Sequence, residues 1–225
     1  VNGDPDFAEY LQRTAGASLS GVLVEFIFFA YGKPLTGKTT LLQALGGVLG
    51  DFCKTADFET FLKRPPTGGP RSDLARLRGA RMVKAVEVGD GRALAEGLLK
   101  LITGGDTLTV RDMYAKEFEY QPQFTLWLAA NDAPAARNDD DALWRRLKRL
   151  PFVHEFSAPD ESIKAKLTDL EYAGPAILRW AVQGCMAWQR WGLEVPAAVR
   201  ASTDEYKQDS DPLAEFLEAK CVESD

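Results

Sequence analysis

The stretch IFFAYGKPLTGKTTLLQALGGVLG, from Ile27 to Gly50, decides the fold of this chain. Between Gly32 and Thr39 it fits the pattern G-x-x-x-x-G-K-[ST], in which backbone N–H groups and a helix N-terminus surround the phosphates of a nucleotide. The pattern requires a buried strand before it and a helix after it. An apolar run ends just before Gly32, and leucines recur at helical spacing over about residues 38–49. The stretch therefore predicts a strand, a phosphate-binding loop and a helix.

Each residue of the predicted loop has an expected part in nucleotide binding. Lys38 would reach and neutralise the β and γ phosphates, Thr39 would hold a magnesium ion, and Thr40 would complete the turn. The positions between the two glycines carry bulky side chains, which the sequence does not explain. The expected ligands are ATP and Mg²⁺. The predicted nucleotide-binding residues are Gly32, Lys33, Pro34, Leu35, Thr36, Gly37, Lys38, Thr39 and Thr40.

Composition narrows the classes of protein to which the chain can belong. Its 225 residues are 45% apolar and 27% charged, as in a globular protein, and no apolar run approaches the roughly 20 residues that span a bilayer. We therefore expect no membrane and a cytoplasmic location, and the three separated cysteines fit a reducing compartment. The single histidine, His154, is too few for a metal cluster or histidine-based catalysis, and we expect it to pack within a strand. The net charge of −6 confines any nucleic-acid contact to a local groove or channel.

The remainder of the chain alternates strand and helix patterns up to about residue 156 and is helical afterwards. This order predicts an α/β fold with a mostly parallel central sheet. An N-terminal helix (1–20) is expected to pack on a core (21–156), and a helical lid or wing (157–225) follows. The other expected elements are strands at 81–88 and 124–131, a helix at about 92–102, two short strands around a turn near 114–117, a basic helix at 142–149 and a strand at 150–156.

Polar residues at the ends of the predicted buried strands are candidates for hydrolysis. An acid near the γ phosphate holds the water shell of magnesium or orients the attacking water. Glu87 ends one buried strand, and Asp90, three residues later, is the alternative. Asn131 ends the next strand and could hydrogen-bond phosphate or water, but Asn-Asp-Ala-Pro is an equally good turn sequence.

A group of cations on the predicted basic helix is a further candidate. Arg145 and Arg146 lie there, with Lys148 and Arg149 close by. Most clusters of this kind are solvated faces of a helix, so the residues alone do not identify a site.

Five segments in order give the chain a family resemblance. They are GKPLTGKTTLLQALGGVLGD, DLARLRGARMVKAVE, LLKLITGGDTLTVRDMYAKEFEYQP, FTLWLAANDAP and DALWRRLKRLPF, and the similarity extends over about residues 5–222. The order resembles the helicase domain of phage and plasmid primase-helicases, which are superfamily 3 members of the AAA+ class related to the poxvirus replicative nucleoside triphosphatase. The resemblance implies a P-loop domain of AAA+ type with a pre-sensor β-hairpin. It also implies a ring, usually hexameric, that moves along single-stranded DNA and unwinds forked DNA with ATP. Any priming activity would lie in a primase domain outside these residues, because they hold no cluster of catalytic carboxylates with a zinc site.

The resemblance implies roles for single residues of the nucleotide site. Lys38 and Thr39 match the first phosphate motif. Glu87 matches the acid of the second motif, which would share the magnesium ion. Asn131 matches the sensor asparagine, so the resemblance favours its role at the phosphate over the turn.

Other residues are implied to act on the nucleotide of a neighbouring subunit. Arg146 falls where the trans-acting arginine finger of this family is expected, with Arg145 as a close competitor. Lys100 matches a lysine that faces the neighbour's nucleotide, although a solvated helix lysine is the simpler interpretation. An arginine supplied by a neighbour can raise the rate by about 10³ to 10⁵, so hydrolysis would depend on assembly.

The resemblance also implies the contact with DNA. The hairpin of residues 106–120 matches the element that projects into the ring channel and grips the DNA backbone. Lys116, near its tip, is the expected phosphate contact, supported by Arg111 and Tyr114. Such contacts carry no sequence information, which suits a motor that moves along any strand.

Two departures from the family pattern leave alternatives open. The family loop usually has glycines and an asparagine where this chain has Pro34, Leu35 and Thr36, and no second acid lies directly beside Glu87. An ATP-dependent DNA helicase domain is the leading hypothesis. The alternatives are an ATP-dependent assembly or loading module with little or no unwinding and, less favoured, a P-loop kinase that acts on a small molecule.

Overall fold

A five-stranded parallel sheet forms the centre of the protein, in a computed structural model that describes residues 3–64, 71–86, 92–156 and 160–211. Every neighbouring pair of strands in this sheet is parallel. The predicted α/β fold class is therefore confirmed. In spatial order the strands are β2 (Cys53–Thr55), β3 (Met82–Val86), β6 (Thr125–Ala130), β1 (Ile27–Tyr31) and β7 (Leu147–Pro151).

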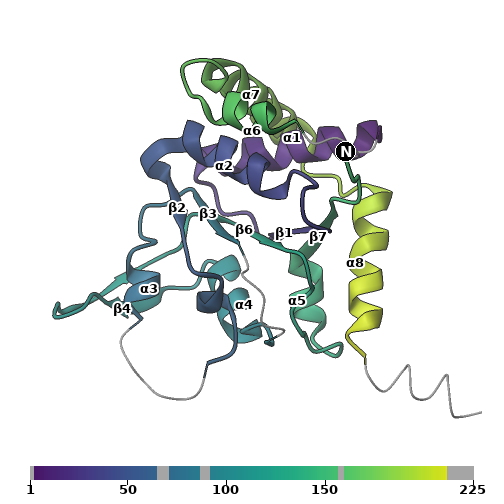
Figure 1. Cartoon of the computed structure of the whole chain (residues 1–225). Coiled ribbons are helices and arrows are strands. Elements are labelled where there is room, and N and C mark those ends of the chain that lie inside the picture. Colours follow the sequence, from purple (N-terminus) through teal and green to yellow (C-terminus); the bar gives the residue numbers. More distant parts are fainter. Residues whose placement is uncertain (1–2, 65–70, 87–91, 157–159, 212–225) are drawn as a thin grey trace, which may run out of the picture.

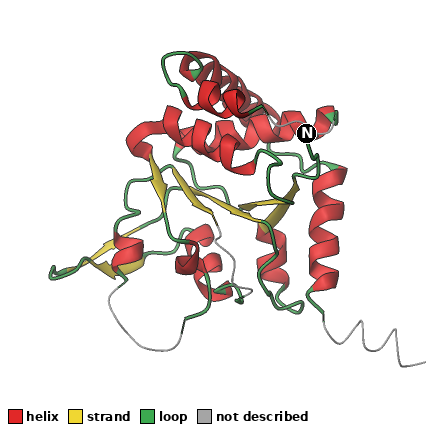
Figure 2. Ribbon diagram, viewed as in Figure 1, coloured by secondary structure: helices red, strands yellow, loops and turns green. Residues whose placement is uncertain are grey.

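Helices cover both faces of this sheet, as Figures 1 and 2 show. None of the described helices has both the length and the apolar character that crossing a membrane requires. On one face lie α1 (Pro5–Ser20), α2 (Lys38–Leu49), α6 (Glu161–Thr168) and α7 (Gly174–Trp191). On the other lie α3 (Ser72–Ala75), α4 (Glu96–Gly104) and α5 (Asp141–Arg146), while α8 (Ala197–Asp209) packs beside β7. Two short 3₁₀ helices, Gly50–Phe52 and Phe58–Phe61, connect these elements.

The apolar run of β1 supplies both hydrophobic cores. Successive side chains of a strand point to opposite faces of the sheet. Ile27 and Phe29 accordingly belong to the core beneath α4 and α5, and Phe28 and Ala30 belong to the core beneath α1 and α2. A strand that is buried on both faces needs apolar residues at every position, which is why this segment shows no alternation.

A separate antiparallel hairpin stands away from the central sheet. It consists of β4 (Leu108–Arg111) and β5 (Glu117–Tyr120), and it projects to the left in Figure 1. The two short strands around a turn that the sequence predicts are therefore confirmed.

Helices α1 and α7 cross at a contact that only glycine allows. A Cβ atom on Gly184 would lie 1.9 Å from the carbonyl oxygen of Gln12, and one on Gly16 would lie 2.0 Å from the backbone nitrogen of Cys185. The side-chain amide of Gln12 donates a hydrogen bond of 2.9 Å to the carbonyl of Trp180 at the same crossing. The backbones of the two helices therefore meet directly, and this contact ties the N-terminal helix to the helical C-terminal part.

Gly184→Ala is expected to lower the free energy of unfolding by about 3 kcal/mol, because the helices must separate to admit a methyl group. Gly97→Ala is the matched control, since a Cβ atom there meets nothing within 4 Å. This control should be neutral or stabilise the protein by up to about 1 kcal/mol, through the higher helix propensity of alanine. Urea denaturation followed by circular dichroism measures both, and equal stability of the two variants would contradict the crossing.

The predicted boundaries after residue 141 are wrong. The basic helix ends at Arg146 rather than at residue 149, because Leu147 to Arg149 pair with β1 as the start of β7. The strand ends at Pro151 instead of extending to residue 156. Proline has no N–H group to donate to a neighbouring strand, which fits its place at a strand end.

Two further expectations fail. His154 does not pack within a strand; it is exposed in the loop after β7, and its ring meets the Phe156 ring edge-on at 4.8 Å. The helix expected over about 92–102 is α4, which begins only at Glu96. The preceding residues are extended instead, because Ala93 and Leu94 form bridges to Ala135 and Leu62.

Candidate phosphate-binding site

The predicted phosphate loop lies at the edge of the sheet where the parallel strands end. It joins β1 to α2, and Asn131 directly follows the neighbouring strand β6. Because parallel strands end at the same edge, residues that are far apart in sequence meet there. Strand β3, which pairs with β6, ends at Val86. Glu87 and its alternative Asp90 come after it and lie outside the described residues.

Lys38 is the centre of this site. Its Nζ atom donates hydrogen bonds to the carbonyl oxygens of Gly32 and Lys33, to the Thr36 hydroxyl at 3.3 Å and to Asn131 Oδ1 at 3.1 Å. The residue is only 6% exposed, and its burial lowers the pKa of the ammonium group. The structure therefore brings together the lysine and the asparagine that the sequence proposes, 93 residues apart.

The N-terminus of α2 supplies backbone donors next to this lysine. Gly37 precedes the helix with a φ of 92°, and no side chain caps the first turn. The first N–H groups of a helix have no partner within the helix, so an uncapped end is a binding site for anions. Thr39 and Thr40 lie in this first turn and are half-buried. The hydroxyl of Thr39 is a hard oxygen donor of the kind that Mg²⁺ prefers.

The tip of the loop is exposed. Lys33, Pro34 and Leu35 face solvent, while Thr36 is buried and donates a hydrogen bond of 2.9 Å to the carbonyl of Lys33. The bulky side chains thus lie outside the loop, and Thr36 closes its turn. Leu35 is 74% exposed and has a φ of 64°, in the left-handed region that favours glycine. This chain therefore has a strained leucine in a part of the loop where the resembling family usually has glycines.

Leu35→Gly is expected to stabilise the folded chain or leave it unchanged, and to tighten nucleotide binding up to about fivefold. The leucine holds a backbone conformation that costs roughly 1 kcal/mol, and glycine removes this cost while allowing the loop to adapt to phosphate. Leu35→Ala is the control, because it removes the same side chain but keeps the strain. Calorimetric titration with ATP measures both. Equal affinities for the two variants would show that strain at this position does not limit binding.

The loop is also held from outside. A Cβ atom on Gly32 would lie 2.1 Å from the carbonyl oxygen of Phe152, so the loop after β7 presses on the start of the phosphate loop. In addition, Lys33 Nζ forms an ion pair of 2.6 Å with Glu155, in which both side chains are exposed. Screening by water and salt makes such a surface pair weak. Sequence reasoning missed Phe152 and Glu155, because no local pattern links residues about 120 positions apart.

The residues expected to act on a neighbouring subunit contact other parts of their own chain. Arg146 is half-buried: its Nη1 donates to the carbonyl of Ala142 at 3.0 Å, and its Nε has no hydrogen-bond partner among the described residues. Arg145, on the same helix, is exposed. Lys100 Nζ forms an ion pair of 2.6 Å with the buried Asp140.

Asp140 links Lys100 to the start of helix α5. It is the N-cap of the helix, where its side chain accepts a hydrogen bond of 3.1 Å from the backbone N–H of Leu143. The hydrogen bond from Lys100 is the largest influence on this carboxylate and holds its pKa below the ordinary value. Lys100 therefore stabilises the start of the helix that carries both arginines.

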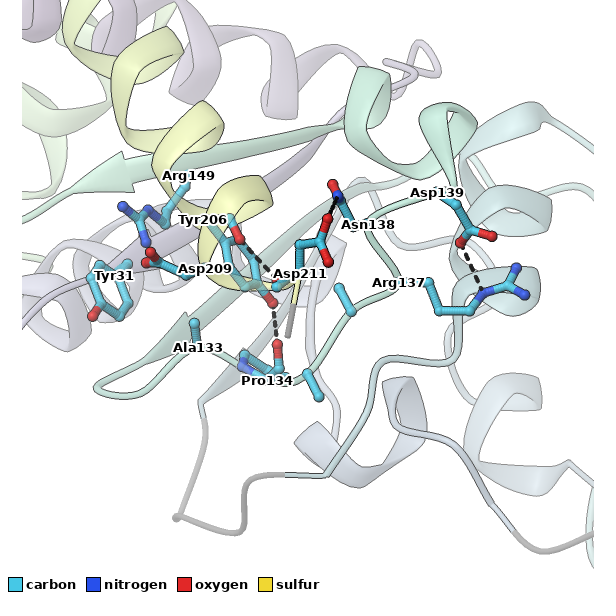
Figure 3. A pocket seen from close by; sticks show the side chains of 13 residues that line it. Tyr31, Ala133, Pro134, Arg137, Asn138, Asp139, Arg149, Tyr206, Asp209 and Asp211 are labelled. Atoms are coloured by element: carbon cyan, nitrogen blue, oxygen red, sulfur yellow. Dashed lines mark hydrogen bonds and ion pairs between the residues drawn. The ribbon is translucent and has the colours of Figure 1, made fainter. Parts of the chain in front are cut away.

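A pocket of about 740 Å³ lies next to the end of β1. Figure 3 shows the side chains that line it. Tyr31, the residue before Gly32, lines it together with Arg149 and Tyr206. Arg149 is only 2% exposed, and its guanidinium lies 4.6 Å from the centre of the Tyr31 ring and 5.6 Å from that of Tyr206. Its Nε donates a hydrogen bond of 2.8 Å to the Ser202 hydroxyl in α8. Arg149 therefore lies on β7 rather than on the predicted basic helix, and its side chain points inward instead of lying on a solvated helix face.

The residues predicted to bind DNA lie together on the hairpin. Arg111 ends β4, Lys116 precedes β5, and Tyr114 lies in the turn between them. All three side chains are exposed.

The family model described as "Family of unknown function (DUF5906)" matches residues 30–146, more than half of the chain, including the phosphate loop, Asn131 and both candidate arginines. Two viral relatives bear the name "Putative helicase". The one from Acanthamoeba polyphaga mimivirus is 28% identical over 238 residues, covering 96% of this chain and 24% of its own length. The one from Frog virus 3 (isolate Goorha) is 27% identical over 230 residues, covering 93% of this chain and 23% of its own length. The chain thus spans about a quarter of the length of these curated relatives.

A solved structure shares the fold. The apo structure of the NrS-1 C-terminal region superimposes with a TM-score of 0.65 at 15% identity, covering 94% of this chain and 49% of that chain. The names of the viral relatives agree with the helicase resemblance that the order of motifs predicts, and that resemblance is confirmed. Because the family model matches more than half of the chain, the chain belongs to the family described as a family of unknown function, DUF5906.

Proposed function

We propose that this chain is the ATP-hydrolysing motor domain of a replicative DNA helicase from a phage, virus or plasmid. The observation that carries the proposal is the position of Lys38, whose ammonium lies between the oxygens of the phosphate loop and Asn131 at the edge of a parallel sheet. The names of the viral relatives support the helicase class. The five segments found in order along the sequence support superfamily 3.

In this proposal the loop binds the phosphates of ATP. The ammonium of Lys38 would exchange the carbonyl oxygens that it now contacts for phosphate oxygens, and the uncapped N–H groups of α2 would complete the cradle. Thr39 would hold Mg²⁺ bound to the nucleotide, together with Glu87. The ion would neutralise charge on the phosphates during transfer to water. Asn131 would then be free to orient the attacking water or to contact the γ phosphate.

Hydrolysis would require a second subunit. Arg146 ends the basic helix α5, where the family resemblance places the trans-acting arginine finger, and this supports a role at the nucleotide of a neighbour. Lys100, now paired with Asp140, would face the same neighbouring nucleotide. We infer a ring, with six subunits as the expected number, in which each site is shared by two chains.

Single-stranded DNA would pass along the hairpins of such a ring. The exposed Lys116 and Arg111 would contact its phosphates, which supports movement along any sequence. A forked duplex would be unwound as the ring advances. A primase domain, which the family resemblance places outside these residues, would act on the same DNA.

The alternative is an assembly or loading module that binds ATP without unwinding. The strained Leu35 in the phosphate loop favours it, because a loop that adapts poorly to phosphate would slow turnover. Strand displacement from a forked duplex, measured with light scattering on the same sample, separates the two functions. The helicase proposal expects rings in the presence of ATP and displacement that requires hydrolysis. Rings without displacement at any ATP concentration would favour the module, and a monomer that binds no DNA would contradict both.

A further inference from the structure

The hairpin has a fixed base and an exposed tip. The side chains of Leu108, Val110 and Tyr120 are buried in the core beneath the sheet. The Tyr120 hydroxyl donates a hydrogen bond of 2.7 Å to the carbonyl of Leu74. Every side chain from residue 111 to 117 is exposed. The hairpin is therefore anchored on the protein and presents its turn outward, as Figure 1 shows.

The turn holds a tyrosine in a conformation that favours glycine. The N–H of Ala115 donates to the carbonyl of Asp112 at 3.1 Å, which closes a four-residue turn with Tyr114 at its third position. Tyr114 has a φ of 63°. A positive φ at this position is usual in type II turns, where glycine or asparagine is strongly preferred. A bulky aromatic residue there is an outlier, and such outliers are a reason to look for function.

Nothing in the described part of the chain compensates for this strain. Tyr114 is 101% exposed, and Met113 beside it is 68% exposed. Asparagine or glycine would form the turn with less strain, so the ring does not serve the fold. The side chain is therefore best explained by contact with a separate molecule.

The charges of the hairpin indicate what kind of contact this is. Residues 111–119 carry two positive charges, on Arg111 and Lys116, and three negative charges, on Asp112, Glu117 and Glu119. Because these charges nearly cancel, attraction to phosphate alone would be weak at each hairpin. An aromatic ring adds a contact that does not depend on charge, since every base has a face on which it can stack.

We propose that Tyr114 stacks on an unpaired base of single-stranded DNA, while Lys116 contacts the adjacent phosphate. The inference rests on the proposed helicase function and adds to it the part of the nucleic acid that the hairpin recognises. It makes the hairpin selective for unstacked bases, which single strands expose and duplexes do not. The contact would carry little preference among bases, as movement along any strand requires.

Fluorescence anisotropy with two labelled probes of equal phosphate number tests this inference. One is an oligothymidylate of about 15 nucleotides, and the other is an abasic oligonucleotide of the same length. The wild-type protein should bind the thymidylate more tightly. Tyr114→Ala should weaken thymidylate binding about 5- to 100-fold and leave abasic binding unchanged, whereas Tyr114→Phe should retain the wild-type preference.

Lys116→Ala is the matched control for charge. It should weaken binding to both probes and reduce the dependence of affinity on salt, because one phosphate contact is lost. The loss caused by Tyr114→Ala should stay constant as salt rises. Equal affinity of the wild-type protein for the two probes, or an equal loss on both from Tyr114→Ala, would overturn stacking while leaving DNA binding intact. Binding to neither probe would overturn the proposed function as well.

Discussion

Lys38→Ala is expected to reduce ATP hydrolysis by about 10²- to 10³-fold, because it removes the cation that would stabilise negative charge on the transferred phosphate. In the structure this ammonium is buried and contacts four oxygens of the site. Methyl replacement leaves no donor at this position. A coupled assay of phosphate release measures the rate at saturating ATP.

The control for this variant is Lys164→Ala. Lys164 is an exposed lysine of α6, so its removal changes the net charge equally without touching the loop. Hydrolysis by the control should equal that of the wild-type protein. Thermal unfolding of both variants checks that the fold is retained. Hydrolysis by Lys38→Ala at the wild-type rate would show that the loop is not the site of reaction.

Arg146→Ala is expected to reduce hydrolysis by about 10³- to 10⁵-fold while ATP binding is retained. The loss is large because the arginine would act only on the charge that develops during phosphate transfer. Mixing the variant with wild-type protein should lower the activity of the mixture by more than dilution, since each altered subunit disables a neighbour's site. Phosphate release measured across mixing ratios tests this.

Arg145→Ala is the matched control on the same helix. Arg145 is exposed and directly precedes Arg146 in α5. Each of the two variants therefore removes one cation from the same helix. If Arg145→Ala abolishes hydrolysis and Arg146→Ala does not, the finger is Arg145. If neither variant changes the rate, the shared-site proposal is wrong.

The sheet and the phosphate loop are predictable from sequence because their signals are local. Strands β1 and β6 are apolar at nearly every position, which indicates burial on both faces. The motif bounded by Gly32 and Gly37, before a periodic helix, indicates the loop. The pairing of Lys38 with Asn131 follows from the parallel strand order, which brings the ends of both strands to one edge.

Other features depend on contacts that the sequence does not encode locally. Arg149 belongs to a run of basic residues that suggests a helix surface, yet pairing with β1 makes it part of a strand and buries it against Tyr31. The left-handed conformation of Leu35 is also hidden, because leucine rarely adopts it. The apolar neighbours of His154 predict a strand, but β7 ends at Pro151, before this residue.

The central claim is that the loop from Gly32 to Thr40 is a nucleotide site governed by Lys38. Calorimetric titration of the wild-type protein and Lys38→Ala with Mg·ATP tests it most directly. We predict one ATP bound per wild-type chain, with a dissociation constant between about 1 μM and 1 mM, and affinity at least about 100-fold weaker in the variant. Equal affinity of the two proteins, or no binding by the wild-type protein, would contradict the account.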